Sequence, residues 1–455
     1  MNESNFSAKM LKMEDAALDT LFFVVGTFRP SQKIRNFPHI SDRFRTSAPV
    51  FHYRGVLRIM SDSSTNWLGL ATLLGVVGAS MYGQKSRSGK KNAGNSGSTL
   101  HLPVVDLQTF FKKDSNPELY QSECKKVADA MHLYGICIVK DPRVHEKDNN
   151  VFINMMERYF GLSDGKRDAR PEVAFQVGVT PSMTEKPKNS CKTFGAYGPD
   201  DKPLTLCPPE KDPKWRFFWR IGPKPEETKF PSLNADPVVP PEIPEWTGVM
   251  DNWGTKMVDA LFVLAEMAAV GFKMEDTGAF TKMMHCGAHL LAPTGSDFNK
   301  FGKDGTVLAG YHYDLNFLTI HGKSRFPGLS VWSRAGQKLS VAMPDGCLLV
   351  QAGKQIEYCT GGHVLAGFHE VVCNSKTVET IEKKKAKGES LWRVSSTLFG
   401  HLQSDHILKP LTPFNTPEAN AAYPDKYVGE QVSEELMAIN LDQTGSTQLK
   451  SPGRK

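Results

Sequence analysis

The stretch Gly310-Tyr-His-Tyr-Asp-Leu-Asn-Phe-Leu-Thr-Ile-His321 holds the most informative pair of side chains in the chain. Its sequence predicts a β-strand, and on a strand His312 and Asp314, two positions apart, project from the same face. An imidazole and a carboxylate are then within reach of one cation. Because His-x-Asp triplets also occur by chance, the pair predicts a metal site only if a third ligand follows on a later strand.

Two histidines compete for the third position, His363 and His369. They share strand parity, but His363 directly follows the turn at Gly361-Gly362, whereas His369 lies among apolar neighbours that would place it in the core. We therefore prefer His369 and expect His363 in a solvent-facing turn. Two histidines and one carboxylate on one face of an octahedron are the ligand set of non-haem iron(II) oxygenases.

The other histidines of this region are expected to be ordinary core or surface residues: His285, His289 and His321.

A candidate anion-binding pair lies further along, in Leu391-Trp-Arg-Val-Ser-Ser-Thr-Leu-Phe399. The alternation of this segment places Arg393 and Ser395 on one face of a strand. An Arg that points into a barrel beside a metal is costly unless an anion meets it. A dicarboxylate chelating the metal could present its far carboxylate to Arg393, with a hydrogen bond from Ser395. The alternative is an Arg paired with a carboxylate of the protein.

The fold class follows from short β segments, separated by Gly, Pro and Asp, that begin at residue 288 and are typical of a sandwich or barrel. We expect strands at 102–106, 135–140, 289–292, 308–320, 329–333, 347–351, 364–372 and 392–399, and helices at 117–134 and 250–272. Residues 180–245 are rich in Pro and Gly and are expected to wrap the surface. Within them, Trp215-Arg-Phe-Phe-Trp219 is either packing or part of a substrate-pocket wall.

These elements predict a mainly β protein with helical additions. A double-stranded β-helix (jelly-roll) core is expected at 288–405, after an N-terminal α/β region at 101–287 that would contribute to the substrate pocket. A C-terminal segment, 406–455, is expected to end in a disordered tail.

The composition, net charge and cysteines limit the classes of protein and partner to consider. The 455 residues are 40% hydrophobic and 23% charged, which is ordinary for a globular enzyme. The net charge of +6 is uneven, because residues 1–100 hold 13 Lys or Arg and 6 Asp or Glu. Since the folded body carries no basic excess, nucleic acid is not an expected partner. The eight cysteines form no CxxC pair, which predicts reduced thiols and no structural zinc.

The N-terminal hundred residues are a separate extension. Residues 63–84 form an uncharged run close to the roughly 20 apolar residues that cross a bilayer. Basic residues follow this run, so the positive-inside rule would keep the downstream chain facing the cytoplasm. A membrane anchor and an interfacial or mobile segment are equally supported. The small polar residues at 86–99 predict a flexible linker. The Arg-rich stretch 28–59 leaves organelle targeting open. It also stays open whether Met1 or Met60 is the true start of the protein.

Over about residues 101–430 the chain resembles the isopenicillin N synthase-like family of iron(II)/2-oxoglutarate-dependent dioxygenases. Leu102-Pro-Val-Val-Asp106 is similar to the family's opening strand, and Pro327-Gly-Leu-Ser-Val331 to its "PGLQV" strand. His312, Asp314 and His369 fall on the family's iron ligands. Arg393 and Ser395 fall on the RxS pair that grips 2-oxoglutarate.

The resemblance implies the cofactors iron(II), 2-oxoglutarate and O2, with ascorbate as a further candidate. It implies hydroxylation or desaturation of a small-molecule substrate, with release of succinate and CO2. A hydrophobic metabolite is a guess from the fold. The oligomeric state is not predicted.

Three departures from the family pattern keep alternatives open. Leu290-Leu-Ala-Pro293 stands where family members carry Asn-x-Tyr before a Pro, so Leu290 and Ala292 lack those hydrogen-bonding groups. Glu370 replaces the Arg usual after the third ligand, and Lys383-Lys-Lys-Ala-Lys387 is an insertion that we expect to form a solvated loop. An iron-dependent oxidase that does not use 2-oxoglutarate and an inactive barrel that only binds a partner are the two competing interpretations.

Overall fold

The computed structural model describes residues 102–449. The predicted membrane segment at 63–84, the linker at 86–99 and the last six residues lie outside the described residues. Between residues 102 and 449, no helix is both long and apolar enough to cross a bilayer. Membrane association through 63–84 and the orientation toward the cytoplasm therefore stay predictions.

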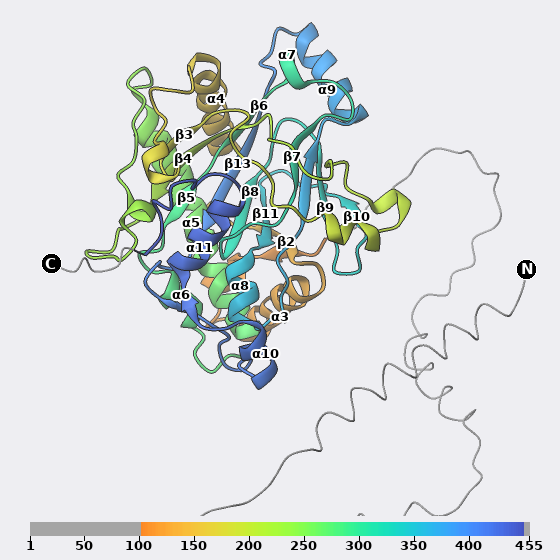
Figure 1. The fold of residues 1–455 in the computed structure, drawn as a ribbon. Coiled ribbons are helices and arrows are strands. Elements are labelled where there is room, and N and C mark those ends of the chain that lie inside the picture. Colours follow the sequence, from red (N-terminus) through yellow and green to blue (C-terminus); the bar gives the residue numbers. More distant parts are fainter. Residues whose placement is uncertain (1–101, 450–455) are drawn as a thin grey trace, which may run out of the picture. The chain divides into compact units, whose positions relative to one another are not determined.

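Two β-sheets form the centre of the described chain (Figure 1). The larger has nine strands in the order β1-β2-β11-β8-β13-β5-β4-β3, with β6 paired to both β13 and β4. The smaller has four in the order β10-β9-β12-β7. This arrangement confirms the predicted mainly β fold with a jelly-roll core.

The strands of the larger sheet are β1 (Val104–Asp106), β2 (Ile136–Lys140), β3 (Gly178–Thr180), β4 (Trp215–Ile221), β5 (His289–Leu291), β6 (Thr294–Asp297), β8 (Leu318–Gly322), β11 (Cys347–Ala352) and β13 (Trp392–Gly400). Those of the smaller sheet are β7 (Val307–His312), β9 (Leu329–Trp332), β10 (Lys338–Ser340) and β12 (His369–Val372). A separate hairpin joins β14 (Ile407–Leu408) to β15 (Lys426–Tyr427).

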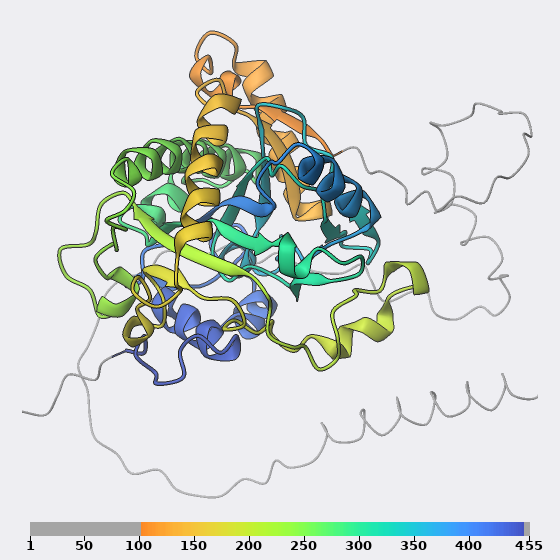
Figure 2. The same ribbon diagram turned by 90° about the horizontal axis from the view of Figure 1, so that it is seen from above.

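Three long helices pack together and against the larger sheet: α3 (Pro117–Tyr134), α4 (Glu146–Leu162) and α5 (Trp246–Gly271). Figure 2 shows α4 crossing in front of the sheet, with α5 beside it. α3 begins after Asn116, whose side chain accepts a hydrogen bond from the Leu119 amide, and ends at Gly135 in the left-handed conformation. Both features agree with the helix predicted at 117–134.

The shorter α-helices are α2 (Gln108–Phe111), α6 (Ala279–Met284), α7 (Phe298–Phe301), α8 (Lys354–Cys359), α9 (Ser375–Ala386), α10 (Pro417–Ala422) and α11 (Val428–Ala438).

Four sequence expectations need correction. The strand expected at 308–320 is two strands, β7 and β8, that belong to opposite sheets, because the chain crosses between them at 313–317. The strand expected at 364–372 begins only at His369. The lysine-rich insertion is not a loop, because it ends helix α9. Residues 180–245 do not only wrap the surface, because β4 enters the larger sheet between β5 and β3.

The division of the chain into the regions 101–287, 288–405 and 406–455 stays a prediction. β1 to β4 of the first region hydrogen-bond into the same sheet as β8, β11 and β13. In the C-terminal segment, α11 buries Val432 and Leu436.

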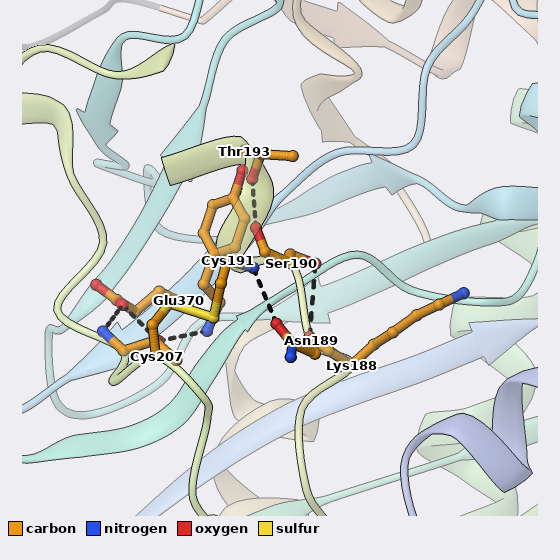
Figure 3. The surroundings of a disulfide bond; sticks show 9 residues. Lys188, Asn189, Ser190, Cys191, Thr193, Cys207 and Glu370 are labelled. Atoms are coloured by element: carbon orange, nitrogen blue, oxygen red, sulfur yellow. Dashed lines mark hydrogen bonds between the residues drawn. A yellow bond between two sulfur atoms is a disulfide. The ribbon is translucent and has the colours of Figure 1, made fainter. Parts of the chain in front are cut away.

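A long segment, residues 181–212, crosses the outer side of the smaller sheet; we call it the strap. Its Thr205 hydroxyl accepts a 2.6 Å hydrogen bond from the Tyr311 amide on β7, and Trp332 on β9 donates to the Asp201 carbonyl at 2.7 Å. A disulfide between Cys191 and Cys207 closes the middle of the strap (Figure 3). The expectation that all eight cysteines are reduced is therefore wrong for this pair, because the strap folds back and brings the two Cα atoms to 5.6 Å.

Candidate active site

The three predicted metal ligands converge between the sheets. His312 ends β7, His369 begins β12, and the two are register partners in the smaller sheet. Asp314 follows β7 by two residues. One donor atom from each residue lies within 4.8 Å of the others. The Nε2 atoms of His312 and His369 lie 3.8 and 3.9 Å from the two carboxylate oxygens of Asp314.

Each imidazole is oriented by the backbone. His312 Nδ1 lies 2.5 Å from the Gly310 carbonyl oxygen, and His369 Nδ1 lies 3.2 Å from that of Gly367. A carbonyl only accepts, so Nδ1 carries the proton in both rings and Nε2 keeps its lone pair. Both lone pairs are therefore available to one metal ion.

The carboxylate is held in its charged form. Burial alone would raise the pKa of Asp314, but His369, His312 and a 2.7 Å hydrogen bond from the Thr319 hydroxyl together lower it below its usual value. Burial is also the main reason that the pKa of His312 lies well below 6.5, which favours the neutral, metal-binding ring. Two imidazoles and one carboxylate fit a divalent metal of the iron(II) type.

The remaining histidines lie apart from this cluster. His363 is exposed in a turn, where its ring stacks on that of His132 with centroids 4.1 Å apart. His289 is buried beside the Met284 carbonyl. His321 faces the site, but its ring nitrogens contact Thr397 and Gln351, and its ring centroid is 6.4 Å from that of His369.

Arg393 is buried without a carboxylate partner. Its Nε donates to the Pro327 carbonyl at 3.3 Å, and no Asp or Glu between residues 102 and 449 forms an ion pair with its guanidinium. Burial lowers its pKa to about 10, so it stays charged at neutral pH. The alternative of an Arg paired with a protein carboxylate therefore does not hold in the described residues.

Two cavities meet at the metal site. The inner one, about 530 Å³, is large enough for a small ligand and contains His312, Asp314, His369, Arg393 and Ser395 in its wall. The outer one lies between the strap, the end of β13 and helix α11. Both walls share five residues, namely Lys214, Arg216, His312, Asp314 and Phe399.

Leu290 and Ala292, at the positions of the family's Asn-x-Tyr pair, lie in an apolar environment. Leu290 and Ala292 form a small buried cluster with Phe218, against which Phe399 packs. This cluster gives the cavities an apolar side. Within the aromatic stretch 215–219, Phe218 lines the outer cavity, whereas Phe217 and Trp219 belong to the main core.

The sequence interpretation missed a buried ionic network beside the metal site. Lys214 Nζ lies 2.9 Å from Glu185 and 2.6 Å from Asp212, and Arg216 Nη2 lies 2.8 Å from Glu185. Asp212 also accepts a 2.9 Å hydrogen bond from the Gly310 amide. The alternation of charged and aromatic residues in 214–217 was the available signal, and Asp212 lies only two residues before Lys214, but Glu185 lies far from both cations in the sequence.

Helix α11 was also missed as part of the site. Its Glu435 forms a 3.0 Å ion pair with Lys188 of the strap and accepts a 2.9 Å hydrogen bond from Tyr313, the residue between two of the metal-site residues. Leu436 and Ile439 complete the wall of the outer cavity. The C-terminal segment therefore borders the site.

This fold is that of the 2-oxoglutarate/iron(II) oxygenases. The chain is similar to a Caulobacter crescentus protein assigned to the 2OG-Fe(II) oxygenase family, with a TM-score of 0.55, 20% identity, and coverage of 74% of this chain and 98% of that one. It is also similar to a full-length Neurospora crassa protein solved with alpha-KG and thymine, with a TM-score of 0.56, 18% identity, and coverage of 74% of this chain and 96% of that one. A third similar structure is JOX2, solved with 2OG, Fe and JA, with a TM-score of 0.52, 15% identity, and coverage of 78% of this chain and 90% of that one.

No protein-family model and no curated protein sequence matches the chain. At these identities the structural likeness establishes the fold, and it confirms at that level the resemblance drawn from the sequence.

Proposed function

We propose that this protein is an iron(II)- and 2-oxoglutarate-dependent oxygenase that hydroxylates or desaturates a small molecule. The observation that carries the proposal is the shared cavity: a charged, buried Arg393 without a carboxylate partner among the described residues faces the same space as two imidazoles and a carboxylate. A buried guanidinium of this kind needs an anion. The fold supports the same conclusion.

In this proposal His312, Asp314 and His369 hold the iron. Arg393 would bind the far carboxylate of 2-oxoglutarate through two parallel hydrogen bonds, and Ser395, whose hydroxyl lies 3.0 Å from that of Thr397, would add a third. When bound, the iron would supply O2 activation at the expense of 2-oxoglutarate, with release of succinate and CO2.

The remaining wall residues would orient the substrate and exclude water. Phe218, Leu290, Phe399 and Leu436 offer an apolar surface to part of the substrate. The strap and α11, joined by the ion pair between Lys188 and Glu435, would keep bulk water from the reacting atoms.

The test is anaerobic calorimetry on the purified chain. Iron(II) should bind first, and 2-oxoglutarate should then bind only to the iron-loaded protein. Addition of O2 should yield succinate, even slowly without a primary substrate. Oxygen uptake without formation of succinate would favour the iron-dependent oxidase. The absence of the Asn-x-Tyr pair is the observation that supports this alternative. No iron affinity would favour an inactive barrel.

A further inference from the structure

We propose that Arg216 binds a carboxylate, or a group of the same charge and shape, on the primary substrate. The proposal deepens the oxygenase assignment and rests on it. It assigns a substrate class, namely small organic acids with an apolar body.

Arg216 lies where the two cavities meet. It belongs to β4, and β6 separates it from β13: Arg216 is the register partner of Thr294, and Arg393 is that of Ser296. Thr294 and Ser296 are two residues apart, so both arginines project from the same face of the sheet. Both line the inner cavity, but Arg216 alone of the two also lines the outer cavity. The site thus offers a second guanidinium, which is shared by the two cavities.

Only part of this guanidinium is occupied. Arg216 Nη2 pairs with Glu185, while its buried Nε has no hydrogen-bond partner among the described residues. The side chain is 11% exposed. A buried N–H without a partner costs free energy that an incoming acceptor would recover. The free donors of Arg216 therefore point to a ligand rather than to a completed structural ion pair.

The guanidinium is also held in place. Its central carbon lies 5.4 Å from the ring centre of Phe218 and 5.3 Å from that of Phe399. Glu185 is anchored in turn by Lys214, which Asp212 holds. A cation fixed in this way loses little conformational freedom on binding, which favours affinity. The two rings supply an apolar surface directly beside it.

The charges in the inner wall favour anions. Six cations line it, and Asp314 is the one carboxylate among its described residues; the cations are Lys214, Arg216, Lys323, Arg325, Lys376 and Arg393. Arg393 would take the co-substrate, which leaves Arg216, with its side chain 11% exposed, as the guanidinium for a second anion. The wall of the outer cavity carries charges of both signs, but its carboxylates are paired or belong to the metal site: Glu185 and Asp212 pair with Lys214, Glu435 pairs with Lys188, and Asp314 is a proposed metal ligand. The apolar part of this wall includes Phe218, Leu290, Phe399 and Leu436.

The experiment measures binding of matched acids and amides. Full-length protein loaded with iron(II) and 2-oxoglutarate is titrated anaerobically with phenylacetate, hydrocinnamate and phenylbutyrate, each beside its primary amide. At least one acid should bind tenfold or more tightly than its amide. Arg216→Gln should weaken that acid about tenfold to hundredfold, as expected for a lost charged hydrogen bond, and leave the amide within about twofold.

Two further variants control for folding and for charge. Arg216→Lys keeps a cation near Glu185 but loses the planar fork, so it should give an intermediate loss. Lys385→Gln removes an exposed cation that lines neither cavity and should change the binding of neither ligand. The thermal unfolding midpoint of each variant reports whether it folds.

Three outcomes overturn the inference: no acid binds more tightly than its amide, Arg216→Gln weakens acid and amide equally, or Arg216→Gln weakens 2-oxoglutarate instead. In all three, wild-type protein that still binds 2-oxoglutarate leaves the oxygenase assignment intact. If wild-type protein binds iron but not 2-oxoglutarate, the proposed function itself fails.

Discussion

The orientation of each imidazole is set two residues before it, by the carbonyls of Gly310 and Gly367. A histidine that reaches the cluster but lacks such a carbonyl would be free to present either nitrogen. In the proposed iron site the backbone would therefore support metal binding, because it fixes which nitrogen faces the ion.

His369→Ala should lower iron(II) affinity by more than about a hundredfold, because loss of a ligand costs more than loss of a supporting hydrogen bond. His363→Ala is the matched control and should leave the affinity within about twofold, since that ring is exposed and stacks on His132. Anaerobic titration with iron(II) measures both. The opposite ranking would move the third ligand to residue 363.

Arg393→Lys should raise the 2-oxoglutarate concentration for half-saturation about tenfold to hundredfold and leave iron affinity unchanged. A lysine keeps the charge but cannot form two parallel hydrogen bonds to one carboxylate. Calorimetry with each ligand separates the two effects. Equal losses of iron and 2-oxoglutarate would argue that the residue stabilises the barrel.

At the scale of elements, the strap depends on Glu370, the residue directly after His369. Its carboxylate accepts from the amides of Leu204 and Thr205 at 3.2 and 2.9 Å and from Lys338 at 3.2 Å. Figure 3 shows Glu370 beside the disulfide. Where the family usually has an Arg, this chain thus uses an acid to fasten a segment whose ends line the outer cavity.

Glu370→Ala should destabilise the fold by about 3–5 kcal/mol, because it leaves Lys338 and two amides without their buried partner. Deuterium exchange should increase in residues 190–207 more than in β7 or β12. The exposed Glu379→Ala is the control and should stay within about 0.5 kcal/mol. Uniform exchange across the domain would mean that Glu370 does not act on the strap in particular.

Elements with strong local signals could be predicted from the sequence. Helix α3 has its capping residues at both ends, and the period-two alternation of β13 gave the facing of Arg393 and Ser395. The break between β7 and β8 could not be predicted, because Leu315 and Phe317 continue an apolar pattern while the chain changes sheets. β4 was missed because the Pro-rich segments around it mask a seven-residue strand.

In the candidate site, too, some features could be predicted from the sequence and others could not. Its proposed metal donors lie two residues apart or on a recognisable strand, and the structure brings all three together. The network around Arg216 joins Glu185 of the strap to β4, and nothing local in the sequence indicates that contact between residues 31 positions apart. The disulfide is a similar case, because two cysteines 16 residues apart form a pair only through the folded path of the strap.

For the whole molecule, buried neutral histidines link stability to pH. Burial is the main cause that lowers the pKa of His289 to about 4. In the unfolded chain its pKa is about 6.5, so between these values the unfolded state binds the proton and the folded state does not. The stability that His289 contributes is present above pH 6.5 and is lost as the pH falls toward 4.

Between pH 7 and pH 5 this residue alone should cost about 2 kcal/mol of unfolding free energy. Urea unfolding at both pH values measures the loss, and His289→Gln should reduce it by that amount. If the wild-type protein and the variant lose the same stability, His289 is not the group that titrates.

Strand β13 carries the proposed co-substrate contacts at Arg393 and Ser395, and Phe399 near its end and His401 directly after it line the outer cavity. Because facing alternates along a strand, adding or deleting one residue between Ser395 and Phe399 would turn the later pair away from the cavity and leave the earlier pair in place. The length of this stretch is thus constrained far more strictly than its composition. New substrate preferences in this protein can arise there by replacement of side chains, but not by a change in spacing.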